Sequence, residues 1–147
     1  MAPTLTQILN AIETTLSAAV TFSQDHDELT EAVVDLPMLQ VYPDAGTMDA
    51  DGRLDRKTFQ GGVRQRGYTI TADYFARERG AGIGEEMGAL VAGIDAIEAV
   101  FQTQDTKPYF GLEGLQAFGP VSWTRVTFVY GEAKFVGARF TIPVRVF

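Results

Sequence analysis

Every second residue from Val136 to Val146 is apolar, and this alternation constrains the fold more than any other feature of the sequence. Side chains two positions apart lie on the same face of a β-strand, so the pattern predicts a long strand with one buried face. The apolar set is Val136, Ala138, Phe140, Ile142, Val144 and Val146. The alternate positions hold a more polar set, which is Gly137, Arg139, Thr141, Pro143, Arg145 and Phe147.

A second strand is predicted immediately before this one. Residues Val121–Tyr130 are rich in Val, Thr, Trp, Phe and Tyr, the residue types that favour strands. The link Gly131–Lys134 is short enough for the two strands to pair as an antiparallel hairpin. The predicted fold therefore closes with a C-terminal β-hairpin.

Pro143 places a residue without a backbone N–H inside the last strand. A proline at such a position indicates a sheet edge or a bulge. Proteins cover an open apolar edge, bend it or pair it with another subunit, because it is an aggregation hazard. An edge covered by the protein's own loops is one interpretation. The other is a subunit or partner interface formed by Arg139, Thr141, Pro143, Arg145 and Phe147.

Two helices are predicted from apolar residues at helical spacing. The first covers Thr4–Val20, and its first residue, Thr4, is of a type that often begins a helix. The second covers residues 83 to about 102 and contains Gly88 and Gly93. Each glycine lowers helix stability by up to about 1 kcal/mol relative to alanine, or else allows the helix to pack closely on a sheet.

Two further strands are predicted at Met38–Pro43 and Val63–Ala76. In the second of these, one face holds Tyr68, Ile70, Ala72, Tyr74 and Ala76, and the other holds Thr69, Thr71, Asp73, Phe75 and Arg77. The elements together predict a single α+β domain over residues 1–147. Its sheet is mostly antiparallel, has about four to five strands, is flanked by two helices and ends in the C-terminal hairpin.

The longest stretch without periodicity is Asp44–Gly62, and loops of such length are usually functional or disordered. Its aspartates partly resemble a calcium-binding loop, but the fifth and twelfth positions from Asp49 are Arg53 and Gln60. We therefore interpret it as a long polar loop of mixed charge, at about residues 44–62, between two strands.

The single histidine, His26, lies among the carboxylates of Asp25, Asp27 and Glu28. This grouping suggests a metal site, but metal ligands are usually fixed on rigid elements, and the surrounding segment lacks a helix or strand pattern. We interpret the segment as a solvated loop.

Glycines at positions 80, 82 and 84 lie between a predicted strand and a predicted helix. A dinucleotide-binding turn needs a third glycine three residues after the second, and the sequence has Glu85 or Met87 there. The Gly-Lys-Ser/Thr ending of a phosphate-binding loop is missing as well. We interpret the glycines as a flexible turn.

Composition narrows the range of functions. The chain has no cysteine, which rules out disulfides, thiolate metal sites and a cysteine nucleophile. A formal net charge of −7 disfavours a protein that coats nucleic acid, yet it is compatible with a pore through which DNA slides. No apolar run approaches the roughly 20 residues of a membrane helix. We predict no catalytic residue, no cofactor and no metal, and hence no enzyme.

The order and texture of the elements resemble the tail terminator family of long-tailed bacteriophages, within the broader group of tail-completion and head–tail joining proteins. Five segments carry this resemblance: LTQILNAIETTL, LPMLQVYP, RGYTITADYFA, MGALVAGIDAIEAVF and KFVGARFTIPVRVF. The resemblance implies a virion protein, assembled in the host cytoplasm, that forms a hexameric ring at the head-proximal end of the tail. Such a ring stops polymerisation of the tail tube and joins the tail to the capsid connector.

The resemblance also implies partners: other copies of the chain, the tail-tube protein, a head-completion or connector protein, and DNA that passes through the lumen without sequence-specific binding. The polar loop would reach the lumen or the next ring through Asp49, Asp51, Arg53, Asp55, Arg56 and Lys57. The alternatives are another head–tail connector or tube-like ring subunit, a small α+β enzyme or ligand-binding domain, and an adaptor that binds a peptide by strand addition.

Overall fold

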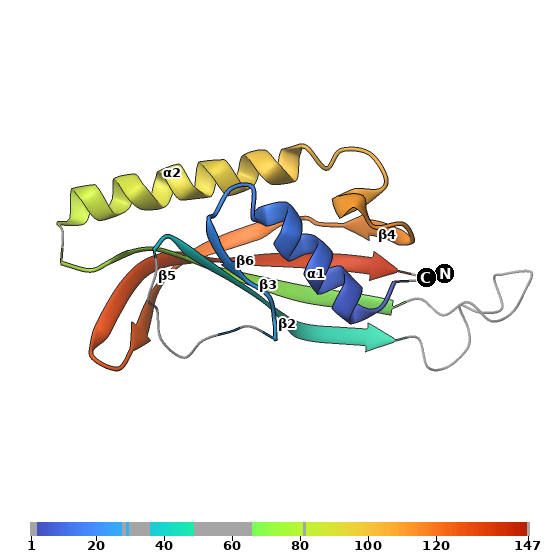
Figure 1. Ribbon diagram of the computed structural model, residues 1–147, viewed down its shortest axis with the longest axis horizontal. Coiled ribbons are helices and arrows are strands. Elements are labelled where there is room, and N and C mark those ends of the chain that lie inside the picture. The colour runs from blue at the N-terminus through green and yellow to red at the C-terminus, as the bar shows by residue number, and fades with distance from the viewer. Residues whose placement is uncertain (1–2, 28, 30–35, 49–65, 81, 147) are drawn as a thin grey trace, which may run out of the picture.

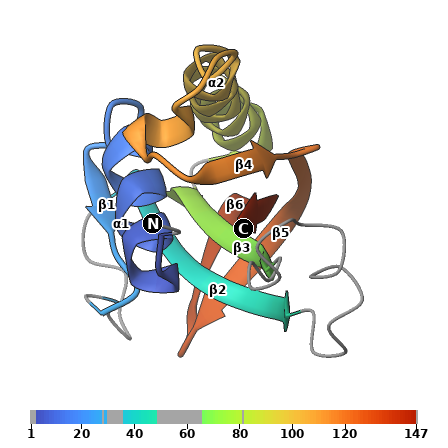
Figure 2. The same cartoon turned by 90° about the vertical axis from the view of Figure 1, so that its right-hand side faces the viewer.

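The computed structural model describes residues 3–27, 29, 36–48, 66–80 and 82–146. It shows an α+β fold in which two helices, α1 (Leu5–Leu16) and α2 (Ile83–Gln102), lie on one side of a curled six-stranded sheet (Figures 1 and 2). The strands are β1 (Phe22–Gln24), β2 (Met38–Met48), β3 (Arg66–Glu78), β4 (Leu115–Phe118), β5 (Ser122–Tyr130) and β6 (Ala133–Val146). A short 3-10 turn, η2 (Tyr109–Gly111), precedes β4. The predicted fold class is confirmed.

The sheet is mixed, because β1 runs parallel to β2 while the other pairings are antiparallel. The strand order is β1-β2-β3-β6-β4, and β5 also pairs with β6. Strands β4 and β5 therefore lie one after the other along the same side of β6, separated by Gly119, Pro120 and Val121. The sequence pattern had missed β1, which falls in the segment predicted as a loop.

β6 is the centre of the sheet, so the prediction that Pro143 marks an edge strand is wrong. Its partners are β3 on one side and both β4 and β5 on the other. The carbonyl of Pro143 accepts a hydrogen bond from the Gly119 N–H at 2.7 Å. Since the N and C=O of one strand residue point to the same side, the missing N–H falls at the junction of β4 and β5. The proline costs no hydrogen bond to β3.

β2 is longer than predicted, and its last residues belong to the segment expected to be a polar loop. Beyond Pro43 the strand continues to Met48 by pairing with the first residues of β3. The register shifts between Pro43 and Ala45, which leaves Asp44 as an extra residue in a bulge. Backbone pairing needs no apolar alternation, so the sequence pattern gave no sign of this extension.

The apolar set predicted on the last strand forms the centre of the hydrophobic core. All six of its residues, from Val136 to Val146, are at most 4% exposed. They pack with the buried stripes of α1 and α2 and with the apolar face of β3, as predicted. Phe140 is fully buried, and truncating a side chain of this kind to alanine typically costs about 3–5 kcal/mol.

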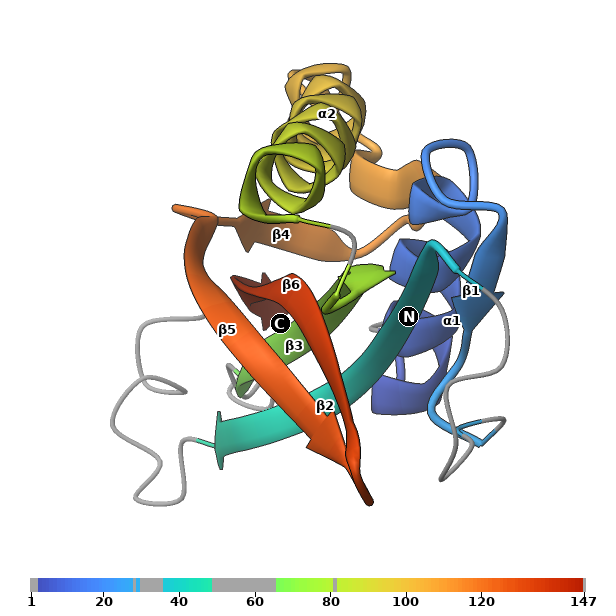
Figure 3. The same cartoon turned by 90° about the vertical axis from the view of Figure 1, so that its left-hand side faces the viewer.

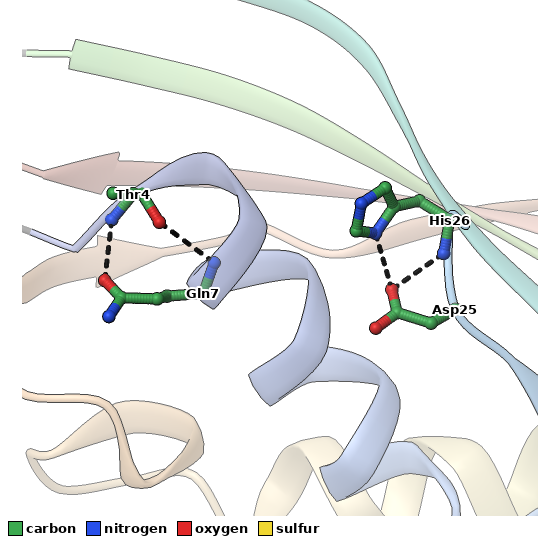
Figure 4. Close-up of polar contacts among 4 residues, drawn as sticks. All are labelled: Thr4, Gln7, Asp25 and His26. Carbon is green, nitrogen blue, oxygen red and sulfur yellow. Dashed lines mark hydrogen bonds and ion pairs between the residues drawn. The ribbon is translucent and has the colours of Figure 1, made fainter. Parts of the chain in front are cut away.

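Helix α1 begins with a capping box, which explains why it starts where it does. The Thr4 hydroxyl accepts a hydrogen bond from the Gln7 N–H at 3.2 Å, and the Gln7 side-chain oxygen accepts one from the Thr4 N–H at 2.9 Å (Figure 4). Two N–H groups that the helix cannot satisfy by itself are thereby paired, so the predicted start at Thr4 is confirmed.

Gly88 and Gly93 of α2 have different surroundings, so alanine is expected to change the stability of the protein in opposite directions at the two positions. A Cβ on Gly93 would overlap the phenol of Tyr74, whereas a Cβ on Gly88 would meet no atom within 4 Å. We expect Gly93→Ala to lower the melting temperature, since α2 must move away from the sheet. Gly88→Ala should raise stability by up to about 1 kcal/mol through helix propensity. Thermal unfolding followed by circular dichroism tests both, and stabilisation by Gly93→Ala would contradict the packing argument.

Candidate assembly surface

The face of the sheet that points away from the helices, here called the open face, contains the residues predicted to form an interface. Arg139, Thr141, Pro143 and Arg145 alternate along β6 on this face. Arg139 and Arg145 are exposed, and the two residues between them are half-buried. Phe147 lies outside the described residues. The structure thus places four of the predicted residues on one surface.

An ion-pair cluster occupies the middle of the open face and connects three strands. The Asp73 carboxylate on β3 is only 4% exposed. It accepts hydrogen bonds from Arg139 Nε on β6 at 2.8 Å, from Arg139 Nη2 at 3.2 Å and from the Tyr42 hydroxyl on β2 at 2.6 Å. Both oxygens of Asp73 are therefore occupied, and the buried carboxylate has the partners that it needs.

The cluster shifts the pKa values of Tyr42 and Arg139. Burial, followed by the hydrogen bond to Asp73, raises the pKa of Tyr42 above its ordinary value. The hydrogen bond to Asp73 is also the main cause that raises the pKa of Arg139. Arg139 lies over the ring of Phe128 as well, with its guanidinium carbon 5.7 Å from the ring centroid. These contacts fix the side chain of Arg139, although its outer part is exposed to solvent.

A second apolar cluster lies on the open face near the β5–β6 turn. Its buried members are Met38, Phe75, Phe128 and Phe135. The rings of Phe75 and Phe128 have their centroids 4.3 Å apart. This cluster was not predicted, because the alternation of the strands indicated a polar alternate face. Aromatic residues on both sides of the predicted turn were the available signal.

At the other end of the open face the surface is hollowed by a groove of about 580 Å³. Strands β2, β3 and β6 and the residues around β4 form it. Its described lining is Ala45, Gly46, Thr47, Met48, Gly67, Tyr68, Thr69, Ala117, Gly119, Pro143, Val144 and Arg145. Arg145 is the only charged residue in this lining, and most of the other side chains are small. A smaller hollow of about 330 Å³ lies beside β4 and contains Lys107 and Glu113.

The two outer edges of the sheet differ in how they are protected. β1 covers the start of β2, and Pro43 and the bulge at Asp44 interrupt the rest of that edge. Among the described residues, β5 pairs only with β6, so its other edge is open along Ser122–Tyr130 (Figure 3). This edge has no proline, and Arg125 is its only charged residue.

Large apolar side chains are exposed next to the open β5 edge. Trp123 is 45% exposed and Val129 is 60% exposed. They point to the helix side of the sheet, where Arg125 Nη1 lies 3.7 Å from Met87 Sδ on α2. On α2 itself, Val91 is 55% exposed. The open edge therefore belongs to β5 and not to β6, the strand on which Pro143 had suggested it.

The histidine and its neighbouring aspartates lie close together in a turn after β1. His26 donates to Asp25 Oδ1 from its backbone N–H at 2.7 Å, and the ring Nδ1 is 2.8 Å from the same oxygen (Figure 4). The ligand atoms of Asp25, His26 and Asp27 lie within 4.8 Å of one another. They are three consecutive residues whose contacts are mainly local, and we assign no metal to them. Glu28 lies outside the described residues.

The glycine-rich turn before α2 is closed by the chain's own carboxylate. Glu86 is only 3% exposed and accepts a hydrogen bond from the Gly80 N–H at 2.8 Å. Arg77 and Glu85 form an ion pair beside it. A side chain of the same chain thus satisfies the Gly80 N–H of this turn.

The predicted lumen residues, from Asp49 to Lys57, lie outside the described part of the chain. Among the described residues, no helix combines the length and the apolar character needed to cross a membrane. The sequence matches no family model and no curated protein.

Proposed function

We propose that this chain is the subunit of a homo-oligomeric ring, a hexamer, at the head-proximal end of a phage tail. The ring ends polymerisation of the tail tube and joins the tail to the capsid connector. Its partners are other copies of the chain, the tail-tube protein and a head-completion protein, and DNA passes through its lumen. The protein acts by assembly, and we assign it no catalytic residue and no cofactor.

The observation that carries this proposal is the open β5 edge with its exposed Trp123 and Val129. An edge strand offers a row of N–H and C=O groups to another chain, and natural proteins usually protect it. Here one edge of the sheet is blunted and the other is not. Tryptophan is enriched among the residues that dominate the binding energy of protein interfaces. An open edge beside an exposed tryptophan is therefore suited to contact another subunit.

Two further observations support a ring through which DNA passes. The order of elements in the sequence resembles that of tail terminator proteins. The formal net charge of −7 also suits a lumen along which DNA moves, since few phosphates would be held by Lys or Arg. A connector ring or a tube-like ring would use the same kind of edge. A terminator ring, a connector ring and a tube-like ring can be distinguished by what each one binds, the tail tube or the capsid connector.

Native mass spectrometry of the purified protein, with electron microscopy of the protein mixed with tail tubes, tests the proposal. We expect a hexamer that caps one end of the tubes. Trp123→Lys should weaken self-association by about thirtyfold or more, as removal of an interface hot spot costs about 2 kcal/mol or more. Phe22→Lys on β1, which changes an exposed aromatic residue at the blunted edge, is the control and should assemble normally.

A wild-type protein that stays monomeric at high concentration and leaves tail tubes uncapped would refute the proposal. Circular dichroism of each variant should match the wild type, which separates loss of assembly from loss of folding.

A further inference from the structure

Strand β6 has a different surface feature at each of its ends. Its first residue, Ala133, follows the β5–β6 turn, whereas Pro143 and Arg145 near its last residue line the groove. Figure 1 shows the turn and the groove-forming ends of β2, β3 and β6 at opposite ends of the molecule. Each end carries charged residues for which the described part of the chain provides no ion pair, among them Glu132 in the turn and Arg145 in the groove.

The β5–β6 turn is shaped for insertion into a recess. Tyr130 pairs with Ala133, so the turn has only Gly131 and Glu132 at its tip. Gly131 has a φ of 61°, the left-handed backbone that tight hairpin turns require and glycine adopts readily. A Cβ on Gly131 would meet no atom within 4 Å, and Glu132 is exposed. The tip therefore projects from the molecule with a carboxylate at its end.

The groove is suited to receive such a tip. Its lining includes Gly67 and Gly119, which have no side chain, and the compact ring of Pro143, so another backbone can approach closely. Thr47 and Thr69 add hydroxyl groups that can bond to the polar backbone of a turn. The volume of about 580 Å³ gives room for a few residues, and Arg145 supplies the complementary charge.

A chain cannot place its own tip in its own groove. Residues 132 and 145 lie at opposite ends of one extended strand, roughly 40 Å apart at the rise of about 3.3 Å per strand residue. The tip can reach a groove only on another molecule. When one surface of each copy binds a different surface of its neighbour, the same contact can repeat from copy to copy. The copies then form a closed ring if the rotation between neighbours adds up to a full turn.

We propose that the β5–β6 tip of one copy docks in the groove of the next copy, with Glu132 against Arg145. This inference rests on the proposed self-association and assigns it a contact, because the tip is the end of the open β5 edge. The apolar residues of that edge supply most of the affinity, and the charge pair determines the specificity and register of the contact. Reversing either charge places two like charges together in the groove.

A charge exchange tests the docking. Arg145→Glu and Glu132→Arg are each expected to weaken self-association at least tenfold in analytical ultracentrifugation of the full chain. An equal mixture of the two variants should assemble again, because each tip then finds a groove of opposite charge on the other variant. The double variant should also assemble. Glu113→Arg, a charge reversal beside β4 and outside the groove, is the control and should behave as the wild type.

The outcomes separate this inference from the proposed function. If the wild type assembles and both single variants assemble equally well, the docking is wrong while the ring proposal stands. If the mixture of the two variants fails to assemble although each variant is folded, the pairing of Glu132 with Arg145 is wrong. A wild type that remains monomeric overturns both the docking and the ring.

Discussion

Gly137→Ala is expected to destabilise the protein by about 3 kcal/mol or more, a large part of the roughly 5–15 kcal/mol that keeps a typical domain folded. A Cβ at this position would overlap the backbone oxygen of Tyr74 on β3 and would come within 2.6 Å of the Phe128 ring. The oxygen belongs to the central strand pair, so it cannot move without disturbing the β3–β6 ladder. Phe128 is held in turn by Phe75 in the second apolar cluster.

Chemical denaturation with urea and thermal unfolding measure this effect. We expect the melting temperature of Gly137→Ala to fall by about 10 °C or more. Gly84→Ala is the matched control, because a Cβ there meets no atom within 4 Å on the exposed start of α2. A Gly137→Ala protein that melts within about 2 °C of the wild type would show that the strands can separate enough to admit the methyl group.

Asp73→Ala is expected to cost about 2–3 kcal/mol, which is the second large effect. The substitution removes the shared acceptor of Tyr42 and Arg139, and hydrogen bonds to a charged group are worth more than neutral ones. The loss is smaller than for a fully buried ion pair, because the Arg139 side chain is 47% exposed and water can solvate it. Asp73→Asn keeps an oxygen acceptor and should lose less stability in urea unfolding. An Asp73→Ala protein as stable as the wild type would contradict a stabilising role for the cluster.

The pH dependence of stability gives an independent check on the same cluster. The pKa of Tyr42 is raised in the folded protein, so the folded state retains the phenol proton at a pH where the unfolded chain loses it. The resulting stabilisation is fully present below about pH 10, the ordinary tyrosine value, and decreases as pH rises above it. Tyr42→Phe should reduce this alkaline loss of stability. An unchanged alkaline profile would indicate that other groups cause it.

The sequence predicted those parts of the fold that depend on alternation or helical spacing. The buried faces of β3 and β6 and the stripes of both helices follow from side-chain pattern alone, because burial selects apolar residues at fixed spacing. The order of strands in the sheet depends on backbone pairing, which has less effect on the pattern of residue types in the sequence. Pro143 was therefore assigned to an edge, although it lies where β4 ends and β5 begins.

The candidate surface was predicted only in part, for a related reason. The alternation placed Arg139, Thr141, Pro143 and Arg145 on one face correctly, since that follows from spacing. It gave no sign that Asp73, 66 positions earlier in the chain, bonds Arg139. The exposed Trp123 and Val129 were also missed, because an apolar strand residue does not reveal from sequence whether a helix covers it. Contacts between distant segments set these properties.

The position of β6 has a mechanical consequence. The strand is held by β3 on one side and by β4 and β5 on the other, over nearly its whole length. The hydrogen bonds between strands run perpendicular to the strand direction. A force applied along β6, between the tip and the groove, would load many of these bonds at once in shear instead of opening them one after another. A chain of copies joined end to end through this strand would transmit tension through its best-supported element.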